Sequence, residues 1–567
     1  MTVTLATDLV TVVGLGSFVG AGLLRTGSSR SAGRHARTGP GDDRTTASRR
    51  PGSPRPGRRA TPHGADAPGW RPALSPMSGR GHRRPSARWA RSTDLRPLTV
   101  DHRTARTGLA PPGRLVLGRA GGRLLAAEPA QSVVVFGPTQ SRKTTGFAVP
   151  AILGWEGPVV ATSVKGDLVR DTIAHRRHLG GVQVVDPGGA TGLATAWWSP
   201  LPSATTWPDA RRAASSLAES ARQSAGPLTD GEFWYATAAK LLAPLLFAAA
   251  TGGRTMEDVV RWVDGHEEDE VLDLLHATGV ESAVLAVRAS FGRDERQRSS
   301  VYTTVETILE PFADVAASHP PGVPGADTGR SDVDPARLLA DRGTVYLCAP
   351  AHDQRRLRPL FTAVVRQVVE HVYDRVARTG RPCDPPLLVV LDEAANIAPL
   401  PDLDTLAATA AGHGVQLVTV WQDLAQVTAR YGPRAATVVN NHRAKVFLSG
   451  ISDASTLDYA SHLIGDEELA LPATTSGGPG GRSTTRQPVT RRLAPPDALR
   501  RIDPGSGVLV YGGLAPARIT LRPWYDVPVL ARRGRLPEGP PGGSPDLSPG
   551  PHPGPPGHYA RHPWPTP

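Results

Sequence analysis

The stretch from Gln131 to Thr145, QSVVVFGPTQSRKTT, constrains the fold of this chain more than any other. Its apolar residues 133–136 form the kind of short run that is typical of a buried parallel strand. A Gly-Pro pair, small polar residues, Lys-Thr-Thr and an apolar, helix-compatible segment follow. Strand, loop, Lys-Thr and helix are the parts of the phosphate-binding loop GxxxxGK[ST]. The sequence therefore predicts a nucleotide-binding α/β domain.

The residue types in this loop suit the phosphates of a nucleotide such as ATP. Backbone N–H groups of the loop and of the helix N-terminus face anionic oxygens, where the helix dipole favours negative charge. We expect Lys143 to contact the β- and γ-phosphates and the Thr144 hydroxyl to hold Mg²⁺. The predicted nucleotide-binding residues are Gly137, Pro138, Thr139, Gln140, Ser141, Arg142, Lys143, Thr144 and Thr145.

One position departs from the motif, because Arg142 stands where the second glycine belongs. If the backbone there needs a positive φ, a non-glycine residue is strained by about 1–2 kcal/mol. The alternative interpretation is a chance strand-turn-helix with a stray lysine. Only four of the 64 basic residues are lysines, and one of them stands at the phosphate-contacting position. This usage favours nucleotide binding, whereas Arg142 leaves the efficiency of hydrolysis open.

Four further positions carry predicted roles in hydrolysis. Residues 387–391 are five apolar residues followed by Asp392 and Glu393, which is the Walker B pattern. We expect Asp392 to join the Mg²⁺ shell and Glu393 to polarise the attacking water. Gln422, at the end of an apolar run, could sense the γ-phosphate or orient water, or be an ordinary loop glutamine. Arg443 is a candidate finger that acts on a neighbouring subunit, since its planar fork spreads charge.

The net charge of +12 is concentrated near the N-terminus. Between Arg25 and Val100 there are 17 arginines and four acidic residues, so the rest of the chain is close to neutral. A basic arm can neutralise nucleic-acid phosphates or lie on anionic lipid. The charge therefore gives no sign that the folded body binds DNA. Two cysteines offer neither a disulfide framework nor a metal cluster.

An apolar segment precedes the basic one. The uncharged run from Leu9 to Leu24 is short for the hydrocarbon core, but counting from Thr2 makes it long enough to span. We expect a single membrane anchor, with the arginine-rich segment on the cytoplasmic side. The alternatives are a disordered N-terminus or a true start at Met77.

The predicted secondary-structure pattern changes several times along the chain. Alternating strand and helix patterns indicate a mainly parallel sheet, and a stretch with helical periodicity alone interrupts them. Residues 471–489 are expected to form a Gly/Ser/Thr-rich loop. The predicted organisation is a possible membrane anchor (1–25), a disordered Arg/Pro-rich linker (26–90), the first part of the nucleotide-binding domain (91–206), an all-α domain (207–335), the second part of the nucleotide-binding domain (336–535) and a disordered Pro/Gly-rich tail (536–567).

With these pieces in place, the chain resembles type IV coupling proteins of the TraG/TraD kind, in their actinobacterial form, over about residues 85–530. The resemblance rests on GPTQSRKTTGFAVPAIL, EFWYATAAKLL, LLVVLDEAANIAPLPDL, VWQDLAQVTARYG and NNHRAKVFLSGISDASTLDYASHLIGD. The string DEAANIAPLPDL is the most specific, because a generic ATPase needs only its Asp-Glu.

The resemblance implies a RecA-like ATPase domain interrupted by an all-α domain, using ATP and Mg²⁺. It also implies a hexamer at the inner, cytoplasmic membrane, with the ATPase domain in the cytoplasm. Such proteins deliver DNA, expected here as a single strand with bound relaxase, to the components of a type IV secretion channel. The family has a hairpin of two membrane helices, whereas this chain has one candidate segment, so a cytoplasmic protein is the alternative.

Two other functions stay open at this point. A nucleotide-binding scaffold with impaired hydrolysis is motivated by Arg142, although an intact Glu393 argues against it. An FtsK-like double-stranded DNA translocase would carry a separate C-terminal DNA-reading module, which the proline-rich tail does not offer.

Overall fold

The computed structural model describes residues 86–225, 230–318, 331–477 and 481–536. The predicted anchor, most of the predicted linker and almost all of the predicted tail lie outside the described residues. The first described residues already contact the folded body. The N–H of Ala87 donates to the carbonyl of Asp466 and that of Ala90 to the carbonyl of Pro516, both at 2.8 Å. The last residues of the predicted linker, Ala87 and Ala90, are therefore joined to the folded body.

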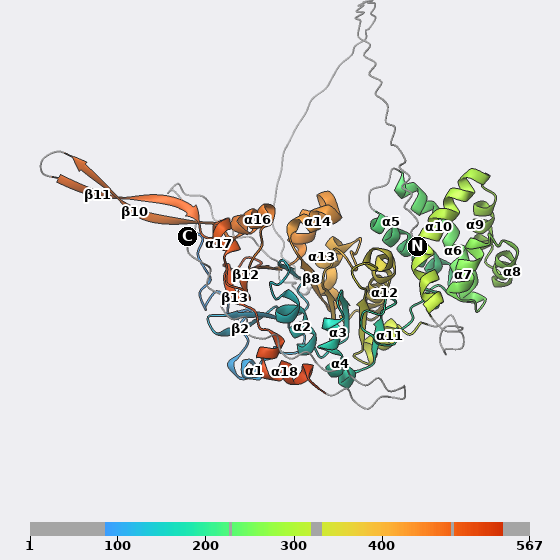
Figure 1. The fold of residues 1–567 in the computed structure, drawn as a ribbon, viewed down its shortest axis with the longest axis horizontal. Helices are drawn as coiled ribbons and strands as arrows, with labels where there is room; N and C mark the ends of the chain where they lie inside the picture. Colours follow the sequence, from blue (N-terminus) through green and yellow to red (C-terminus); the bar gives the residue numbers. More distant parts are fainter. Residues whose placement is uncertain (1–85, 226–229, 319–330, 478–480, 537–567) are drawn as a thin grey trace, which may run out of the picture. The chain divides into compact units, whose positions relative to one another are not determined.

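The centre of the protein is an eleven-stranded sheet with the order β2-β1-β13-β12-β9-β3-β8-β7-β4-β6-β5 (Figure 1). The seven strands from β9 to β5 are parallel, and the other four are antiparallel. This confirms the predicted α/β fold with a mainly parallel sheet. The strands are β1 (Val116–Ala120), β2 (Arg123–Ala126), β3 (Val133–Phe136), β4 (Val159–Ser163), β5 (Val182–Val185), β6 (Thr344–Cys348), β7 (Leu387–Leu391), β8 (Val415–Trp421), β9 (Ala444–Leu448), β12 (Ser506–Tyr511) and β13 (Ala517–Thr520).

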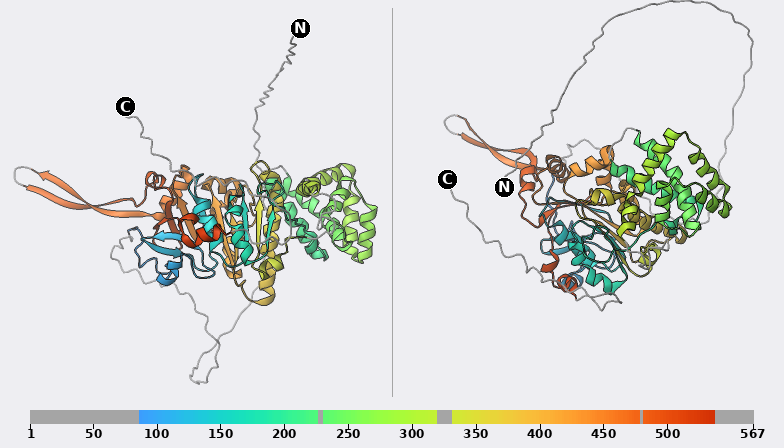
Figure 2. Two further views of the ribbon diagram at one scale, coloured as in Figure 1. Left: turned by 60° about the horizontal axis from the view of Figure 1, so that its bottom comes forward. Right: turned by 45° about the vertical axis from the view of Figure 1, so that its right-hand side comes forward.

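The parallel strands are mostly apolar and mostly buried because both faces of the sheet are covered. In β3, Val134 and Phe136 face one core, whereas Val133 and Val135 face the other. Helices lie on both sides of the sheet (Figure 2). Outside the helical block described below, the helices are α1 (His102–Thr107), α2 (Val149–Gly154), α3 (Asp167–Arg170), α4 (Ile173–Leu179), α11 (Pro335–Ala340), α12 (Gln354–Thr379), α13 (Leu403–His413), α14 (Leu424–Tyr431), α15 (Ala435–Asn441), α16 (Ala454–Ile464), α17 (Pro496–Arg500) and α18 (Pro528–Gly534).

A helical block follows β5 in the chain and precedes α11 and β6. Its helices are α5 (Trp207–Ala225), α6 (Gly231–Thr251), α7 (Met256–Asp264), α8 (Asp269–Thr278), α9 (Glu281–Phe291) and α10 (Glu295–Ser318). Within the described part of residues 207–318 the structure contains no strand. Gly and acidic caps divide the helices, as in α7, where Thr255 and Asp258 form a capping box. The limits of this block as a domain stay a prediction.

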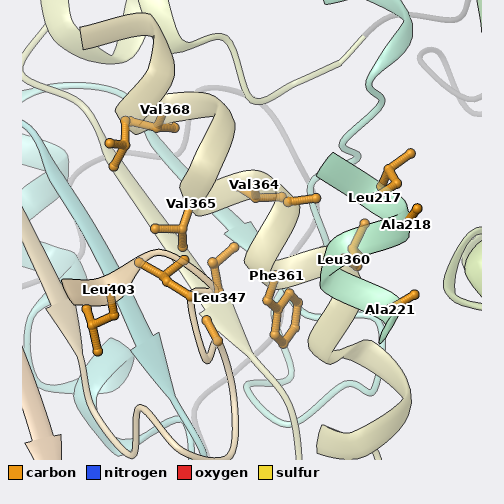
Figure 3. Packing of buried hydrophobic residues seen from close by; sticks show 14 of the residues in the cluster. Leu217, Ala218, Ala221, Leu347, Leu360, Phe361, Val364, Val365, Val368 and Leu403 are labelled. Atoms are coloured by element: carbon orange, nitrogen blue, oxygen red, sulfur yellow. The ribbon is translucent and has the colours of Figure 1, made fainter. Parts of the chain in front are cut away.

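The block joins the sheet through α12. Figure 3 shows Leu217, Ala218 and Ala221 of α5 beside Leu360 and Phe361 of α12. The opposite side of α12 faces the sheet, where Val365 lies near Leu347 of β6 (Figure 3). Burial of apolar surface stabilises a fold by about 25 cal/mol per Å². Because both sides of α12 are buried in this way, the helix belongs to the cores of the helical block and of the sheet.

The predicted Gly/Ser/Thr-rich loop at 471–489 is wrong. The chain forms a long hairpin there, β10 (Asp466–Gly477) with β11 (Gly481–Arg492), which extends away from the main sheet (Figures 1 and 2). The register pairs Asp466 with Arg492 and Gly477 with Gly481. Threonine is β-branched and favours strands even without an apolar run, and both arms are rich in it. Composition alone suggested a loop because the two arms contain few large apolar residues, and Leu471 and Val489 are exposed.

One helix among the described residues is long and apolar enough to cross a membrane by length and composition, namely α6. Of its apolar window, 67% is buried inside the protein. Its buried face includes Leu241, Leu242 and Leu246, which pack in the core of the helical block. The apolarity of α6 is therefore explained by internal packing.

Candidate nucleotide-binding site

The candidate site lies at the carboxyl ends of three adjacent parallel strands, β3, β8 and β7. Gly137, Gln422 and Asp392 each follow directly after one of these strands. The N–H of Gly137 donates to the carbonyl of Trp421 at 3.0 Å, so the loop starts in register with β8. Ligands of open α/β sheets bind at this edge. The fold thus brings the two halves of the predicted motif to one place.

The loop after β3 is tightly built. A Cβ on Gly137 would collide with Oγ of Ser141, so a side chain is excluded there. The N–H of Ser141 donates to the carbonyl of Pro138 at 3.2 Å and closes a turn. Gln140 has a φ of +68° and Arg142 a φ of +65°, whereas Lys143 is right-handed. Left-handed residues beside right-handed ones turn successive N–H groups into a concave anion-binding surface.

Arg142 adopts the left-handed conformation for which the motif normally uses glycine, at a cost of about 1–2 kcal/mol. Its side chain extends toward Gly505, where a Cβ would lie 3.1 Å from Nη1 of Arg142. Gly505 precedes β12, and β9 and β12 lie on one side of β3, whereas β8 and β7 lie on the other. The guanidinium therefore leaves the loop on the side opposite to Asp392.

The helix after the loop begins with a wider turn. Residues Thr144–Ala148 form a π-helical turn, and the N–H of Val149 donates to the carbonyl of Thr144, five residues earlier. Pro150 has no N–H to donate, which removes one α-helical bond at this point. π-Turns occur often at functional sites. The predicted helical segment is thus present, but its first turn is not α-helical.

Thr144 and Asp392 connect the two motifs directly. The Thr144 hydroxyl donates to Oδ2 of Asp392 at 2.8 Å, and the Thr162 hydroxyl donates to the carbonyl of Asp392 at 2.9 Å. Oδ1 of Asp392 is buried and has no hydrogen-bond partner among the described residues. Burial raises the pKa of Asp392 to about 6, against the opposing effects of the Thr144 hydrogen bond and the charge of Lys143.

These groups fit a magnesium nucleotide. Nζ of Lys143 is largely buried and has one long contact, 3.4 Å from the carbonyl of Pro138. Oγ of Ser141 is buried without a described partner, like Oδ1 of Asp392. The Lys143 ammonium with this long contact, together with a hydroxyl and a carboxylate oxygen that have no described partner, suits phosphate oxygens and Mg²⁺. The residues present therefore match the predicted ligand.

Glu393 lies beside Asp392 in a strained backbone conformation, with a φ of +54°. Such strain persists only where the surroundings impose it, and it gathers at functional sites. Here the N–H of Asn396 donates to the Glu393 carbonyl at 2.9 Å, and Nδ2 of Asn396 approaches Oε2 of Glu393 at 3.3 Å. Asn396 was not predicted from the sequence, although it lies in the string DEAANIAPLPDL. The spacing of three residues was the available signal.

Gln422 lies between the two motifs, because β8 separates β3 from β7. Its own N–H donates to Oε1 of Gln426 at 3.0 Å, and Asp423 caps α14 through the N–H of Gln426. The structure therefore brings the half-buried Gln422 to the edge that carries Gly137 and Asp392. Its chemical role stays a prediction.

Arg443 lies elsewhere. It precedes β9, and β9 runs parallel to β3 with Ala444 opposite Val133, so Arg443 is at the amino-terminal edge of the sheet. Its Nε is 3.0 Å from Oε2 of Glu128, and its guanidinium lies over the ring of Tyr511 at 5.4 Å. Arg443 thus does not join the site of its own chain. A role in a neighbouring copy stays a prediction.

The fold and the site define a phosphate-binding-loop protein with a RecA-like core. Residues 99–538 match the family described as Type IV secretory system Conjugative DNA transfer. This match covers most of the chain, and the chain belongs to that family.

Individual relatives agree with the family. The chain is 25% identical over 455 residues to a conjugal transfer protein TraG of Escherichia coli, covering 72% of this chain and 69% of the relative. It is 25% identical over 448 residues to the protein VirD4 of Agrobacterium fabrum, covering 74% and 63%.

Solved structures of the bacterial conjugative coupling protein TrwB have the same fold. The unbound form of TrwBdeltaN70 has a TM-score of 0.56 at 18% identity, over 78% of this chain and 95% of that one. TrwB in complex with ADP and Mg²⁺ has a TM-score of 0.55 at 17% identity, over 78% and 95%.

Proposed function

We propose that this protein is an ATP-hydrolysing coupling protein that delivers DNA, with a bound relaxase, to a conjugative type IV secretion channel. The observation that carries the proposal is the hydrogen bond between Thr144 and Asp392, which assembles both nucleotide motifs in a member of this family. The names of its relatives, conjugal transfer protein TraG and VirD4, support the DNA-transfer role.

The proposed cofactors are ATP and Mg²⁺, and TrwB has been solved with an ATP analogue and with ADP and Mg²⁺. Backbone N–H groups of residues 137–145 and the Lys143 ammonium would hold the phosphates. The Thr144 hydroxyl and Oδ1 of Asp392 would hold the cation. Bound Mg²⁺ neutralises charge on the phosphate oxygens.

Glu393 is the proposed general base. Its carboxylate is half-buried, adjacent to Asp392, and Asn396 restrains it from one side. A positioned carboxylate accepts a proton from the attacking water, and such catalysis contributes about 10²–10⁴-fold. Gln422 is proposed to orient that water, because it ends the strand between the two motifs. Arg443 is proposed to act on the site of a neighbouring copy.

Arg142 is compatible with this activity. Its backbone already has the φ that the loop requires, and its side chain points toward Gly505. Arg142 strains the backbone, and the rest of the fold has to offset that strain. Its side chain leaves the phosphate-binding surface of residues 137–145 open. A scaffold without hydrolysis is the second candidate function, and the same strained residue is the observation that favours it.

The proposed assembly and location follow the family. We propose a homo-oligomer, a hexamer, that holds single-stranded DNA and is attached to the inner membrane through the apolar residues near the N-terminus. The ATPase domain would then lie in the cytoplasm. The basic segment between Arg25 and Val100 supports contact with an anionic surface or with nucleic acid.

The test is ATP turnover by the full chain with single-stranded DNA, with double-stranded DNA and without DNA. The proposal predicts Mg²⁺-dependent turnover that single-stranded DNA stimulates and that Glu393→Gln abolishes. Tight ATP binding without turnover under all three conditions would support the scaffold instead. Stimulation by double-stranded DNA alone would contradict the proposed substrate.

A further inference from the structure

Arg430 in α14 connects two distant parts of the chain through one guanidinium. Its Nη1 donates to the carbonyl of Gln223 at 2.9 Å, and its Nη2 donates to the carbonyl of Ala395 at 3.1 Å. Gln223 is in the last turn of α5, the first helix of the helical block. Ala395 follows Glu393 by two residues. One side chain therefore links the helical block to the segment that carries the proposed base.

The contact with α5 has a clear physical basis. An α-helical carbonyl accepts from the N–H four residues later, and for Gln223 that residue is Pro227, which has no N–H to donate. A cation at a helix C-terminus also interacts favourably with the helix dipole. Arg430 thus caps α5 from outside the helical block.

The segment after Glu393 depends on side-chain donors of this kind. Residues 394–402 form neither a regular helix nor a strand, so their carbonyls need other partners. Nε of Arg358 donates to the carbonyl of Asn396 at 3.0 Å, and the Tyr431 hydroxyl donates to that of Leu400 at 2.9 Å. With Arg430, these donors fix the backbone next to Asn396, which restrains Glu393.

Two arginines are brought together here without a carboxylate partner among the described residues. Burial, together with the charge of Arg430, lowers the pKa of Arg358 to about 10. Burial likewise lowers the pKa of Arg430. Like charges in a poorly solvated place repel, so both guanidiniums rely on the carbonyls that they contact. If α5 moves and Arg430 does not follow, Arg430 loses its hydrogen bond to the carbonyl of Gln223.

We propose that Arg430 is a positioning residue for Glu393, and that it makes the placement of this glutamate depend on the C-terminal end of α5. The inference deepens the proposed function and rests on it, because it assigns a route by which the helical block acts on hydrolysis. A structural change in the block then alters kcat, whereas nucleotide affinity, which depends on residues 137–145, is unaffected.

The kinetic test compares the full chain with Arg430→Gln and Arg430→Lys. Arg430→Gln is expected to lower kcat about ten-fold, with KM and the Kd for a non-hydrolysable ATP analogue within two-fold. Arg430→Lys keeps the charge but not the fork, so partial activity is expected. Arg434→Gln is the matched control, because Arg434 contacts Asp404 at a nearby position and not residues 394–402. An unchanged kcat in Arg430→Gln would overturn the proposal.

A double-mutant cycle with Asn396→Ala separates positioning from general destabilisation. If both residues act on Glu393 through the same segment, the two losses in kcat are not additive. Additive losses, or equal falls in kcat and in analogue affinity, would indicate an ordinary structural role.

Hydrogen exchange provides a measurement that does not need turnover. In Arg430→Gln, faster exchange is expected both at the C-terminal end of α5 and in residues 394–402, with α6 unchanged. A change confined to one of the two segments would overturn the link. If the wild-type protein binds ATP but does not hydrolyse it, the proposed function fails, and exchange still decides whether Arg430 couples the segments.

Discussion

The hydroxyl of Thr144 donates a 2.8 Å hydrogen bond to Oδ2 of Asp392, although 248 residues separate the two in the chain. Parallel pairing of β3 with β8 and of β8 with β7 sets this distance. The bond leaves Oδ1 of Asp392 without a partner among the described residues. One contact therefore joins the two motifs and leaves an oxygen that suits a cation.

Lys143 and Thr144 are expected to act differently. Lys143→Ala removes the ammonium and should weaken binding of an ATP analogue at least ten-fold, with or without Mg²⁺, because a charge-assisted hydrogen bond is worth about 1.5–3 kcal/mol. Thr144→Ala should weaken binding only when Mg²⁺ is present. Calorimetry with and without EDTA measures both. Equal losses in Thr144→Ala under both conditions would show that Thr144 does not act through the cation.

The raised pKa of Asp392 leads us to expect an unusual pH dependence of stability. Its pKa is raised to about 6 in the folded protein, whereas an unfolded aspartate titrates near pH 4. The native carboxyl thus keeps its proton to higher pH, and the free energy of unfolding falls as pH rises from about 4 to about 6. Asp392→Asn has no carboxyl group to ionise, so its free energy of unfolding does not fall for this reason. In EDTA at pH 7.5 we expect the variant to be more stable by on the order of 3 kcal/mol, although it is inactive.

Denaturant unfolding at several pH values checks this prediction. The difference between Asp392→Asn and the wild type should disappear near pH 4, where both side chains are neutral. A variant that is less stable than the wild type at pH 7.5 would contradict a raised pKa at Asp392.

Gly505 and Arg142 are expected to be coupled. Gly505→Ala places a methyl group 3.1 Å from Nη1 of Arg142 and forces an L-residue to a φ of +82°. We expect a loss of about 1–3 kcal/mol in unfolding free energy in the wild type. In an Arg142→Gly background only the backbone strain remains, so the loss should be smaller. Equal losses in both backgrounds would mean that the guanidinium does not lie over Gly505 in solution.

The hairpin of β10 and β11 is expected to contribute little to the stability of the body. Its two strands pair only with each other among the described residues, and a two-stranded hairpin is marginally stable in water. Replacing residues 470–488 by a short Gly-Ser turn should change the melting temperature by less than about 2 °C. Contacts at its base, such as Ala87 with Asp466, are kept as a control. A large drop would show that the body depends on the hairpin.

The parallel sheet could be predicted because both of its faces are buried, so that each strand is a run of apolar residues such as 387–391. The nucleotide site followed, since Asp392 and the loop that carries Lys143 and Thr144 come directly after such strands. The hairpin was missed because Thr-rich arms lack this signal. Arg430 was missed because nothing in the sequence near it indicates that Gln223 and Ala395 will lie on either side of it.

Backbone conformation was predictable only where a motif supplied it. The positive φ of Arg142 was anticipated from the missing glycine, whereas those of Gln140 and Glu393 were not. Glu393 is held by hydrogen bonds from Asn396 within the turn, and the next residue, Ala394, donates to the carbonyl of Val420 at 3.1 Å. The position of Arg443 at the amino-terminal edge likewise depended on the parallel register of β9 with β3.

The most direct test of this account is steady-state ATP hydrolysis by the wild-type protein, Arg142→Gly and Glu393→Gln in Mg²⁺. We expect turnover in the wild type and, because the loop already has the required conformation, a kcat within about two-fold of it in Arg142→Gly. We expect a loss of at least about 100-fold in Glu393→Gln. An inactive wild type that gains turnover only in Arg142→Gly would contradict this account and identify a disabled loop.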